Sequence, residues 1–195
     1  MKEYIKGEKV SISDTKDCNL TDEGTETAKM TAEVREKALL RLTSLCMQGE
    51  HCKKDVMEKM EKWGIPDDLQ EDILENLIAE RFVDEKRYCR SFIHDKLAYN
   101  KWGRRKIEQA LWMKGIGKEI YAEAFEDIDE AQWREALEPL LRQKSATTKG
   151  RNEYEKKQKL IRFALGRGFY MEDILEAMKV MNMDMDCDAD SDDFA

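Results

Sequence analysis

The sequence predicts an all-α protein built from three tandem three-helix repeats, and three observations favour this fold. The chain of 195 residues is rich in Lys, Glu, Leu, Ala and Met, which favour helices, and it contains only 2 prolines. Its apolar residues recur at steps of three and four, as they do along one face of a helix. Three glycines spaced 51 and 53 residues apart have matching surroundings, which indicates an internal repeat.

The two ends of the chain lack this pattern. Residues 1–30 mix charged, polar and glycine residues without sustained apolar periodicity, so we expect a disordered arm, with a short strand over residues 4–12 as the alternative. Residues 183–195 contain six aspartates and no base, and we expect an acidic disordered tail there.

The first repeat is expected over residues 31–81. Val34, Ala38 and Leu42 share one helical face and indicate its first helix. Pro66, followed by two aspartates, indicates the start of its last helix. Proline suits a first turn because its missing N–H would be unused there, and acids favour the positive end of the helix dipole.

The second repeat is expected over residues 82–128 and the third over residues 129–182. Asp84 and Asp129 are predicted N-caps, because a short acidic side chain accepts hydrogen bonds from the unpaired N–H groups of a first helical turn. The third repeat also carries an inserted basic loop, residues 143–153, between its first two helices.

The repeat is centred on Gly64, Gly115 and Gly168, each of which is predicted to end a helix. The positions four and eight residues before each glycine, and the position directly after it, are apolar in all three copies. In chain order of the glycines these residues are Met60, Leu111 and Ala164; Val56, Ile107 and Leu160; and Ile65, Ile116 and Phe169. Repeats of about fifty residues stack side by side and bury a continuous core.

Composition and spacing exclude several functional classes. The chain has no run of about 18 apolar residues and no apolar signal region at its N-terminus, so we expect a cytoplasmic protein with no membrane segment. Its 5 cysteines and 2 histidines lack the paired spacing of a zinc site, and we expect reduced thiols. We predict no catalytic, cofactor-binding or metal-binding residues, and we do not expect an enzyme.

The net charge of −8 conceals an uneven distribution of charge. Residues 1–30 have a net charge of −2 and residues 183–195 have one of −6, so the region between them is close to neutral. Within that region, residues 101–114 have a net charge of +4 and residues 142–168 have one of +7. An anionic partner is therefore compatible with the acidic average.

Bases of these two stretches are the candidates for a surface that faces DNA or a partner protein. They are Lys101, Arg104, Arg105, Lys106, Lys149, Arg151, Lys156, Lys157, Lys159 and Arg162. Lys53, Arg104 and Lys157 lie eleven residues before the three glycines, so stacked repeats would align them into a stripe that follows a phosphate backbone. The alternative is an ordinary solvated helix face. Binding to such a stripe would be weak, nonspecific and sensitive to salt.

Residues 81–116 contain a dense motif that opens with R-F-x-D-E-x-x-Y, continues through K-W-G and closes with K-G-I. The residues that form it are Arg81, Phe82, Asp84, Glu85, Tyr88, Phe92, Lys101, Trp102, Gly103, Ile107, Leu111, Lys114, Gly115 and Ile116. This motif resembles the RecX family of bacterial regulatory proteins. In the first and third repeats, mainly the repeat geometry agrees with that family.

The resemblance implies an elongated, curved right-handed stack of three-helix repeats. It also implies a regulator without catalysis or cofactors, which binds the RecA recombinase and its nucleoprotein filament on single-stranded DNA. Such a regulator inhibits strand exchange, ATP hydrolysis and co-protease activity, and so acts in DNA repair, recombination and the SOS response. We expect a monomer that makes weak nonspecific DNA contacts and has no membrane partner.

Two other functions stay open from the residues alone. A three-helix unit resembles helix-turn-helix domains, so the chain could be a helical nucleic-acid-binding module that acts without RecA and prefers a sequence. A helical repeat scaffold for an unrelated partner is the third hypothesis.

Overall fold

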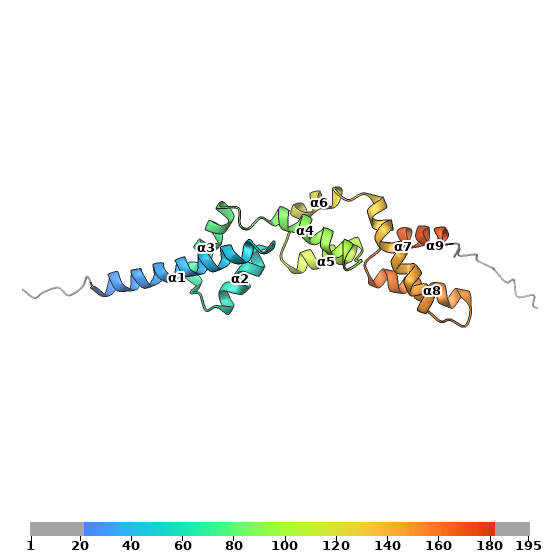
Figure 1. The fold of residues 1–195 in the computed structure, drawn as a ribbon, viewed down its shortest axis with the longest axis horizontal. Coiled ribbons are helices and arrows are strands. Elements are labelled where there is room, and N and C mark those ends of the chain that lie inside the picture. The colour runs from blue at the N-terminus through green and yellow to red at the C-terminus, as the bar shows by residue number, and fades with distance from the viewer. Residues whose placement is uncertain (1–21, 182–195) are drawn as a thin grey trace, which may run out of the picture.

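The computed structural model describes residues 22–181, and every regular element in that part of the chain is an α-helix. Unit 1 comprises α1 (Asp22–Cys46), α2 (Lys53–Lys62) and α3 (Asp67–Ala79). Unit 2 comprises α4 (Glu85–Ala98), α5 (Arg104–Met113) and α6 (Lys118–Glu126). Unit 3 comprises α7 (Glu130–Thr147), α8 (Glu153–Gly166) and α9 (Met171–Val180). The units follow one another along an elongated molecule (Figure 1). The predicted all-α fold of tandem three-helix repeats is therefore confirmed.

Two predicted boundaries differ from the structure. Helix α1 begins at Asp22, so the arm expected over residues 1–30 is corrected over its last part. Helix α7 continues to Thr147 and replaces the first part of the loop expected over residues 143–153. Both stretches are poor in large apolar residues, which are the signal that a periodicity argument needs. The remainder of the arm, its alternative strand and the acidic tail lie outside the described residues.

The three repeat glycines follow the second helix of each unit. Their φ angles are +68°, +77° and +93°, a left-handed conformation that side chains other than glycine rarely adopt. In each turn, the N–H of the residue after the glycine donates to the carbonyl of the residue four positions before the glycine. These pairs are Ile65 to Met60 at 3.0 Å, Ile116 to Leu111 at 3.2 Å and Phe169 to Ala164 at 3.3 Å. The predicted C-terminal glycine turns are confirmed as Schellman-type ends.

The described chain contains two hydrophobic cores. Unit 1 has its own core, in which Leu42, Met60 and Leu77 are fully buried. Units 2 and 3 share the second core, which runs from Ile93 in α4 to Met178 in α9. The two cores are adjacent along the stack, and Cys52, which directly precedes α2, belongs to the second of them.

The second helices of the three units meet end to end. The start of α5 lies against the glycine turn after α8, where Gly103 N–H donates to Arg167 O at 2.9 Å. The start of α2 lies against the end of α5, where Lys114 Nζ donates to Asp55 Oδ1 at 2.5 Å. The helices α8, α5 and α2 therefore form a column along the stack (Figure 1). In this column each positive helix start faces a negative helix end, which favours the arrangement.

Candidate partner-binding surface

Two adjacent arginines at the start of α5 have different environments. Arg104 Nε donates to Glu108 Oε1 at 3.0 Å, and its guanidinium lies 4.8 Å from the ring centre of Phe125. Arg105 is exposed, and its backbone N–H donates to Gly168 O at 3.1 Å. Adjacent helical residues point about 100° apart, so the two guanidinium groups face different surroundings. Arg104 is held by its own chain, whereas Arg105 presents its charge to solvent.

The lysines beside α5 gather around Trp102. Lys106 Nζ lies 4.5 Å from the centre of this ring and Lys96 Nζ lies 5.3 Å from it, which are cation–π distances. Lys101 directly precedes the tryptophan and has a left-handed φ of +52°. This strained backbone lets the chain turn sharply from α4 into α5. Trp102 therefore fixes part of the predicted basic surface by packing.

The candidate bases of unit 3 surround the start of α8. Lys159 Nζ pairs with Glu155 at 2.8 Å and donates to Lys149 O at 2.9 Å. The Arg151 N–H donates to Glu155 Oε2 at 2.8 Å, and Asn152 caps the helix by accepting from Glu155 N at 2.8 Å. These contacts close the loop onto the first turn of α8.

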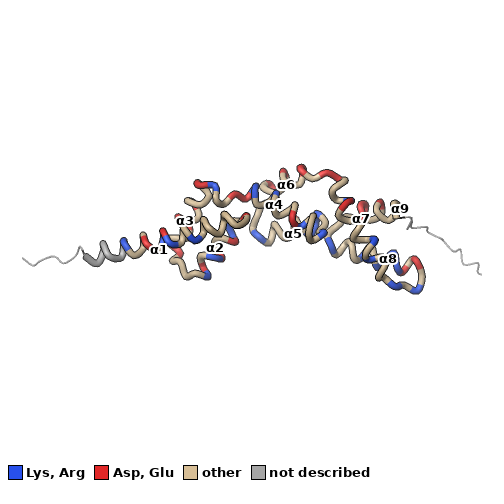
Figure 2. The backbone as a smooth tube through the Cα atoms, in the orientation of Figure 1, with Lys and Arg blue, Asp and Glu red and all other residues tan. Residues whose placement is uncertain are grey.

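Other bases of unit 3 extend this surface along α8. Arg162 is exposed, while Lys156 and Lys157 are half-buried. Figure 2 shows Lys and Arg gathered on α8 and on the loop before it, at one end of the described stack. The structure thus brings the bases of residues 149–162 together around one helix.

The three bases that the repeat aligns all make contacts within the chain. Lys53 Nζ lies 3.4 Å from Glu85 Oε2, Arg104 pairs with Glu108, and Lys157 also interacts within the chain. The stripe position therefore serves internal contacts in every unit. Exposed positive charge of α5 and α8 lies instead at Arg105 and Arg162.

A concavity of about 360 Å³ lies between α5 and α8. It is lined by Arg105, Lys106, Gln109, Leu165, Gly166 and Gly168. Its charged lining residues are the two bases Arg105 and Lys106, and no acid is among the lining residues, so the concavity suits an anionic group.

Trp112 continues the exposed face of α5 and was not a predicted site residue. Its exposed fraction is 74%, and that of the adjacent Met113 is 62%. The available signal was periodicity: Ile107 and Leu111 define the buried face of α5, and Trp112 lies off that face.

Several residues of the family motif shape the entry into unit 2. Asp84 caps α4 by accepting from Arg87 N at 3.0 Å, and this hydrogen bond lowers the pKa of Asp84. Arg87 Nη2 donates to the carbonyls of Arg81 and Phe82, at 3.1 and 3.3 Å. These bonds hold Arg81 in its left-handed conformation, with a φ of +58°. The motif therefore encodes a rigid turn between units.

Other motif residues build the interior and the junctions. Tyr88 is buried and stacks on Phe92 with ring centres 5.6 Å apart. Three further motif residues are almost fully buried in the core shared by units 2 and 3, namely Ile107, Leu111 and Ile116. Gly103, Lys114 and Glu85 are motif residues that take part in contacts between units, and Gly115 forms the glycine turn between α5 and α6.

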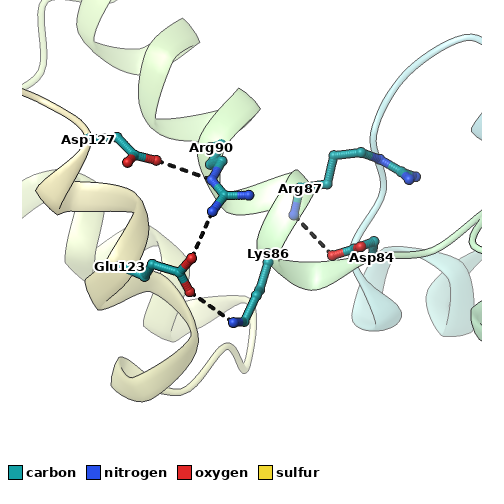
Figure 3. Close-up of polar contacts among 6 residues, drawn as sticks. All are labelled: Asp84, Lys86, Arg87, Arg90, Glu123 and Asp127. Carbon is teal, nitrogen blue, oxygen red and sulfur yellow. Dashed lines mark hydrogen bonds and ion pairs between the residues drawn. The ribbon is translucent and has the colours of Figure 1, made fainter.

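An ion-pair network joins α4 to α6 (Figure 3). Lys86 Nζ and Arg90 Nη2 bind the two carboxylate oxygens of Glu123 at 2.8 and 2.9 Å, and Arg90 Nε binds Asp127 at 3.1 Å. The hydrogen bond and charge of Lys86 lower the pKa of Glu123. These bases are engaged by acids, so this surface is less suited to an anionic partner than that of α5.

Among the described side chains, those of residues 29–181, no group of three or more His, Cys, Asp or Glu is placed to hold a metal ion. None of the described helices combines the length and apolar character needed to cross a membrane.

Comparisons with known proteins agree with this architecture. The family model of the second three-helix domain of RecX matches residues 84–124, and that of the third matches residues 130–178. Regulatory protein RecX of Lactobacillus johnsonii is 28% identical over 118 residues, which cover 60% of this chain and 44% of that protein. Regulatory protein RecX of Clostridium botulinum is 30% identical over 129 residues, which cover 65% of this chain and 59% of that protein. The match thus spans about half the length of these relatives.

A solved structure shows the same fold. A crystal structure of regulatory protein RecX has a TM-score of 0.72 to this chain at 23% identity, and the match covers 82% of this chain and 79% of that one. Both matched domains coincide with units 2 and 3, where the motif and the junction residues lie. The chain therefore belongs to the RecX family.

Proposed function

We propose that this protein binds the RecA filament on single-stranded DNA and inhibits its ATPase, strand-exchange and co-protease activities. Membership of the RecX family supports a regulatory role, and RecA is the partner that the motif over residues 81–116 implies. The observation that carries the proposal is Arg105, an exposed base beside an acid-free concavity near the middle of an elongated stack.

The shape and charge of the stack suit a filament. A nucleoprotein filament is long and rich in phosphate, and it presents the same protomer surface repeatedly. An elongated stack of rigid units can contact neighbouring protomers at once, and simultaneous weak contacts add to a higher affinity. Contacts from exposed bases such as Arg105 to the filament phosphates would release counterions, so this binding is expected to weaken as salt rises.

A RecA ATPase titration tests the proposal. Increasing amounts of the full chain are added to RecA, single-stranded DNA and ATP, and the rate of ATP hydrolysis is expected to fall. Arg105→Glu should raise the concentration needed for half-inhibition by about tenfold, as the loss of one charged contact predicts. Lys37→Glu is the matched control: it makes the same charge change on α1, where the side chain is 79% exposed.

Unchanged hydrolysis and unchanged filament length at saturating protein would contradict the proposal. Sequence-preferring duplex binding without RecA, together with unchanged hydrolysis, would instead favour the nucleic-acid-binding module.

A further inference from the structure

The exposed face of α5 combines an aromatic ring with a positive charge. Arg105, Gln109 and Trp112 occupy positions i, i+4 and i+7, so they share one side of the helix. The other three tryptophans of the chain are packed against the two hydrophobic cores. Trp112 is 74% exposed, so its ring contributes little to folding and is available to a ligand.

The charge on this face is open to an anion. Glu108 engages Arg104, which leaves Arg105 at the rim of the concavity between α5 and α8. No acid lines the concavity, and on α8 the exposed Arg162 lies one turn before its lining residues Leu165 and Gly166. A phosphate in the concavity would therefore meet the positive charge of Arg105 and Lys106 on α5.

We propose that this face of α5 binds single-stranded nucleic acid, with a phosphate held by Arg105 and a base stacked on Trp112. The inference rests on the proposed function and deepens it by naming the surface that meets the strand. Exposed rings beside bases are how proteins bind single strands without sequence preference, because every base has a π-face. A duplex is disfavoured, because its bases are already stacked on one another. A protein partner is also disfavoured, because the concavity beside the ring is polar and charged.

Binding of the full chain to a fluorescein-labelled oligothymidylate tests this surface, by fluorescence anisotropy at low salt and without RecA. Trp112→Ala is expected to weaken binding by about fivefold to a hundredfold, the loss expected for one stacked base. Trp112→Phe keeps a ring and should retain most of the affinity. Tyr99→Ala is the matched control, because Tyr99 is an 80% exposed aromatic residue at the end of α4. Circular dichroism and thermal melting should show every variant folded.

Salt dependence separates the two contacts. Arg105→Ala should make the negative slope of log affinity against log salt less steep by about 0.7, because one phosphate contact to a single strand is lost. Trp112→Ala should lower affinity without changing that slope, because stacking releases no counterion. The oligothymidylate should also quench the tryptophan fluorescence of the unmodified chain, and Trp112→Phe should remove most of that quenching.

Unchanged oligothymidylate binding by both Trp112→Ala and Arg105→Ala would overturn the inference. If Trp112→Ala loses RecA inhibition but keeps oligothymidylate binding, the face contacts protein, and only this inference fails. If the oligothymidylate results are as expected but the unmodified chain does not affect RecA hydrolysis, the inference stands and the proposed function fails.

Discussion

The two junctions of the stack have the same geometry and different chemistry. In both, the start of a second helix meets the glycine turn at the end of the next unit's second helix. Between units 2 and 3 the contact is mainly main chain to main chain: Gly103 N–H donates to Arg167 O at 2.9 Å and Arg105 N–H to Gly168 O at 3.1 Å. One side chain, Arg167, adds a hydrogen bond from its Nη1 to Asn100 O at 2.9 Å. Between units 1 and 2 it is made by side chains: Lys54 Nζ donates to Met113 O at 3.0 Å and Lys114 Nζ to Asp55.

The residue at the N-cap explains the difference. Cys52 caps α2 and Gly103 caps α5, at equivalent positions of the repeat and with the same extended backbone. The Cys52 side chain is fully buried in the junction, and this burial raises the pKa of its thiol to about 11. Glycine has no side chain at this point, so the backbones of units 2 and 3 come into direct contact.

Close contact of the backbones has a consequence for the interior. Units 2 and 3 share one core, whereas unit 1 keeps a core of its own that ends at the junction. A small residue at the cap thus joins two repeats into one packed body. At the junction between units 1 and 2 the larger residue Cys52 occupies this position, and side chains make the contact there. Those side chains can be substituted, and some of them titrate.

Gly103→Ala should have the largest effect, because it makes the tighter junction resemble the looser one. A Cβ at this position would lie 2.3 Å from Gly168 C and from Phe169 N, both of them backbone atoms that cannot move alone. We expect a loss of about 3 kcal/mol in the free energy of unfolding, at the upper end for overpacking. Urea denaturation followed by circular dichroism measures this loss. The amide of Arg105 should also exchange faster with solvent.

Gly166→Ala is the control, since a Cβ there meets nothing within 4 Å. It should leave stability unchanged or raise it by up to about 1 kcal/mol, because alanine favours a helix over glycine. Equal stability of the Gly103→Ala and Gly166→Ala variants would contradict the role of the close backbone approach.

Local order was predictable from the sequence because it depends on neighbours in the chain. The glycine turns, the N-caps at Asp84 and Asp129 and the buried face of α5 all depend on residues a few positions apart in the chain. Even the pairing of Arg104 with Glu108 has such a spacing, i to i+4, and could have separated Arg104 from Arg105 beforehand.

The junction contacts were not predictable in this way. Lys114 and Asp55 are 59 residues apart, and their pairing requires the orientation of one unit on the next. The exposure of Trp112 has the same origin, because it depends on which face of α5 the neighbouring units cover. Repeat spacing defines the units but not the rotation between them.

Changes at Lys114 and Asp55 should have an intermediate effect and be confined to the looser junction. The pair is only partly exposed, at 32% and 20%, and each charge lies at the helix end that favours it. A double-mutant cycle with Lys114→Met and Asp55→Asn should give a coupling energy of about 1–2 kcal/mol in urea denaturation.

The exposed pair of Lys37 and Glu33 on α1 is the control for this cycle. Its two side chains are 79% and 70% exposed, so Lys37→Met should change stability by less than about 0.5 kcal/mol. A coupling energy for Lys114 and Asp55 no larger than this change would indicate that the looser junction depends on burial alone.

The smallest expected effect is a pH dependence that only the looser junction has. Burial alone would raise the pKa of Asp55, but its hydrogen bonds from Lys114 and Cys52 and the charge of Lys114 lower it overall. Its contribution to stability is therefore complete above about pH 3.9, the usual unfolded value, and is lost as pH falls through the lower folded value. Burial likewise opposes the charge of Lys114, but Asp55 raises the pKa of that amine overall. The contribution of Lys114 is complete below about pH 10.4 and is lost as pH rises through the higher folded value.

Comparing the unmodified chain with the variant that carries both Lys114→Met and Asp55→Asn isolates this dependence. Other carboxylates and lysines titrate in both proteins, so their contributions cancel in the difference between the two unfolding free energies. That difference should be constant between about pH 5 and pH 9 and should shrink at lower and at higher pH. It should shrink by no more than the coupling energy, because titration removes the same ion pair that the double-mutant cycle measures. A difference that stays constant down to pH 2 would mean that Asp55 gains nothing from Lys114. The main-chain hydrogen bonds between units 2 and 3 contain no titrating group, so Gly103→Ala should shift the stability curve equally at every pH.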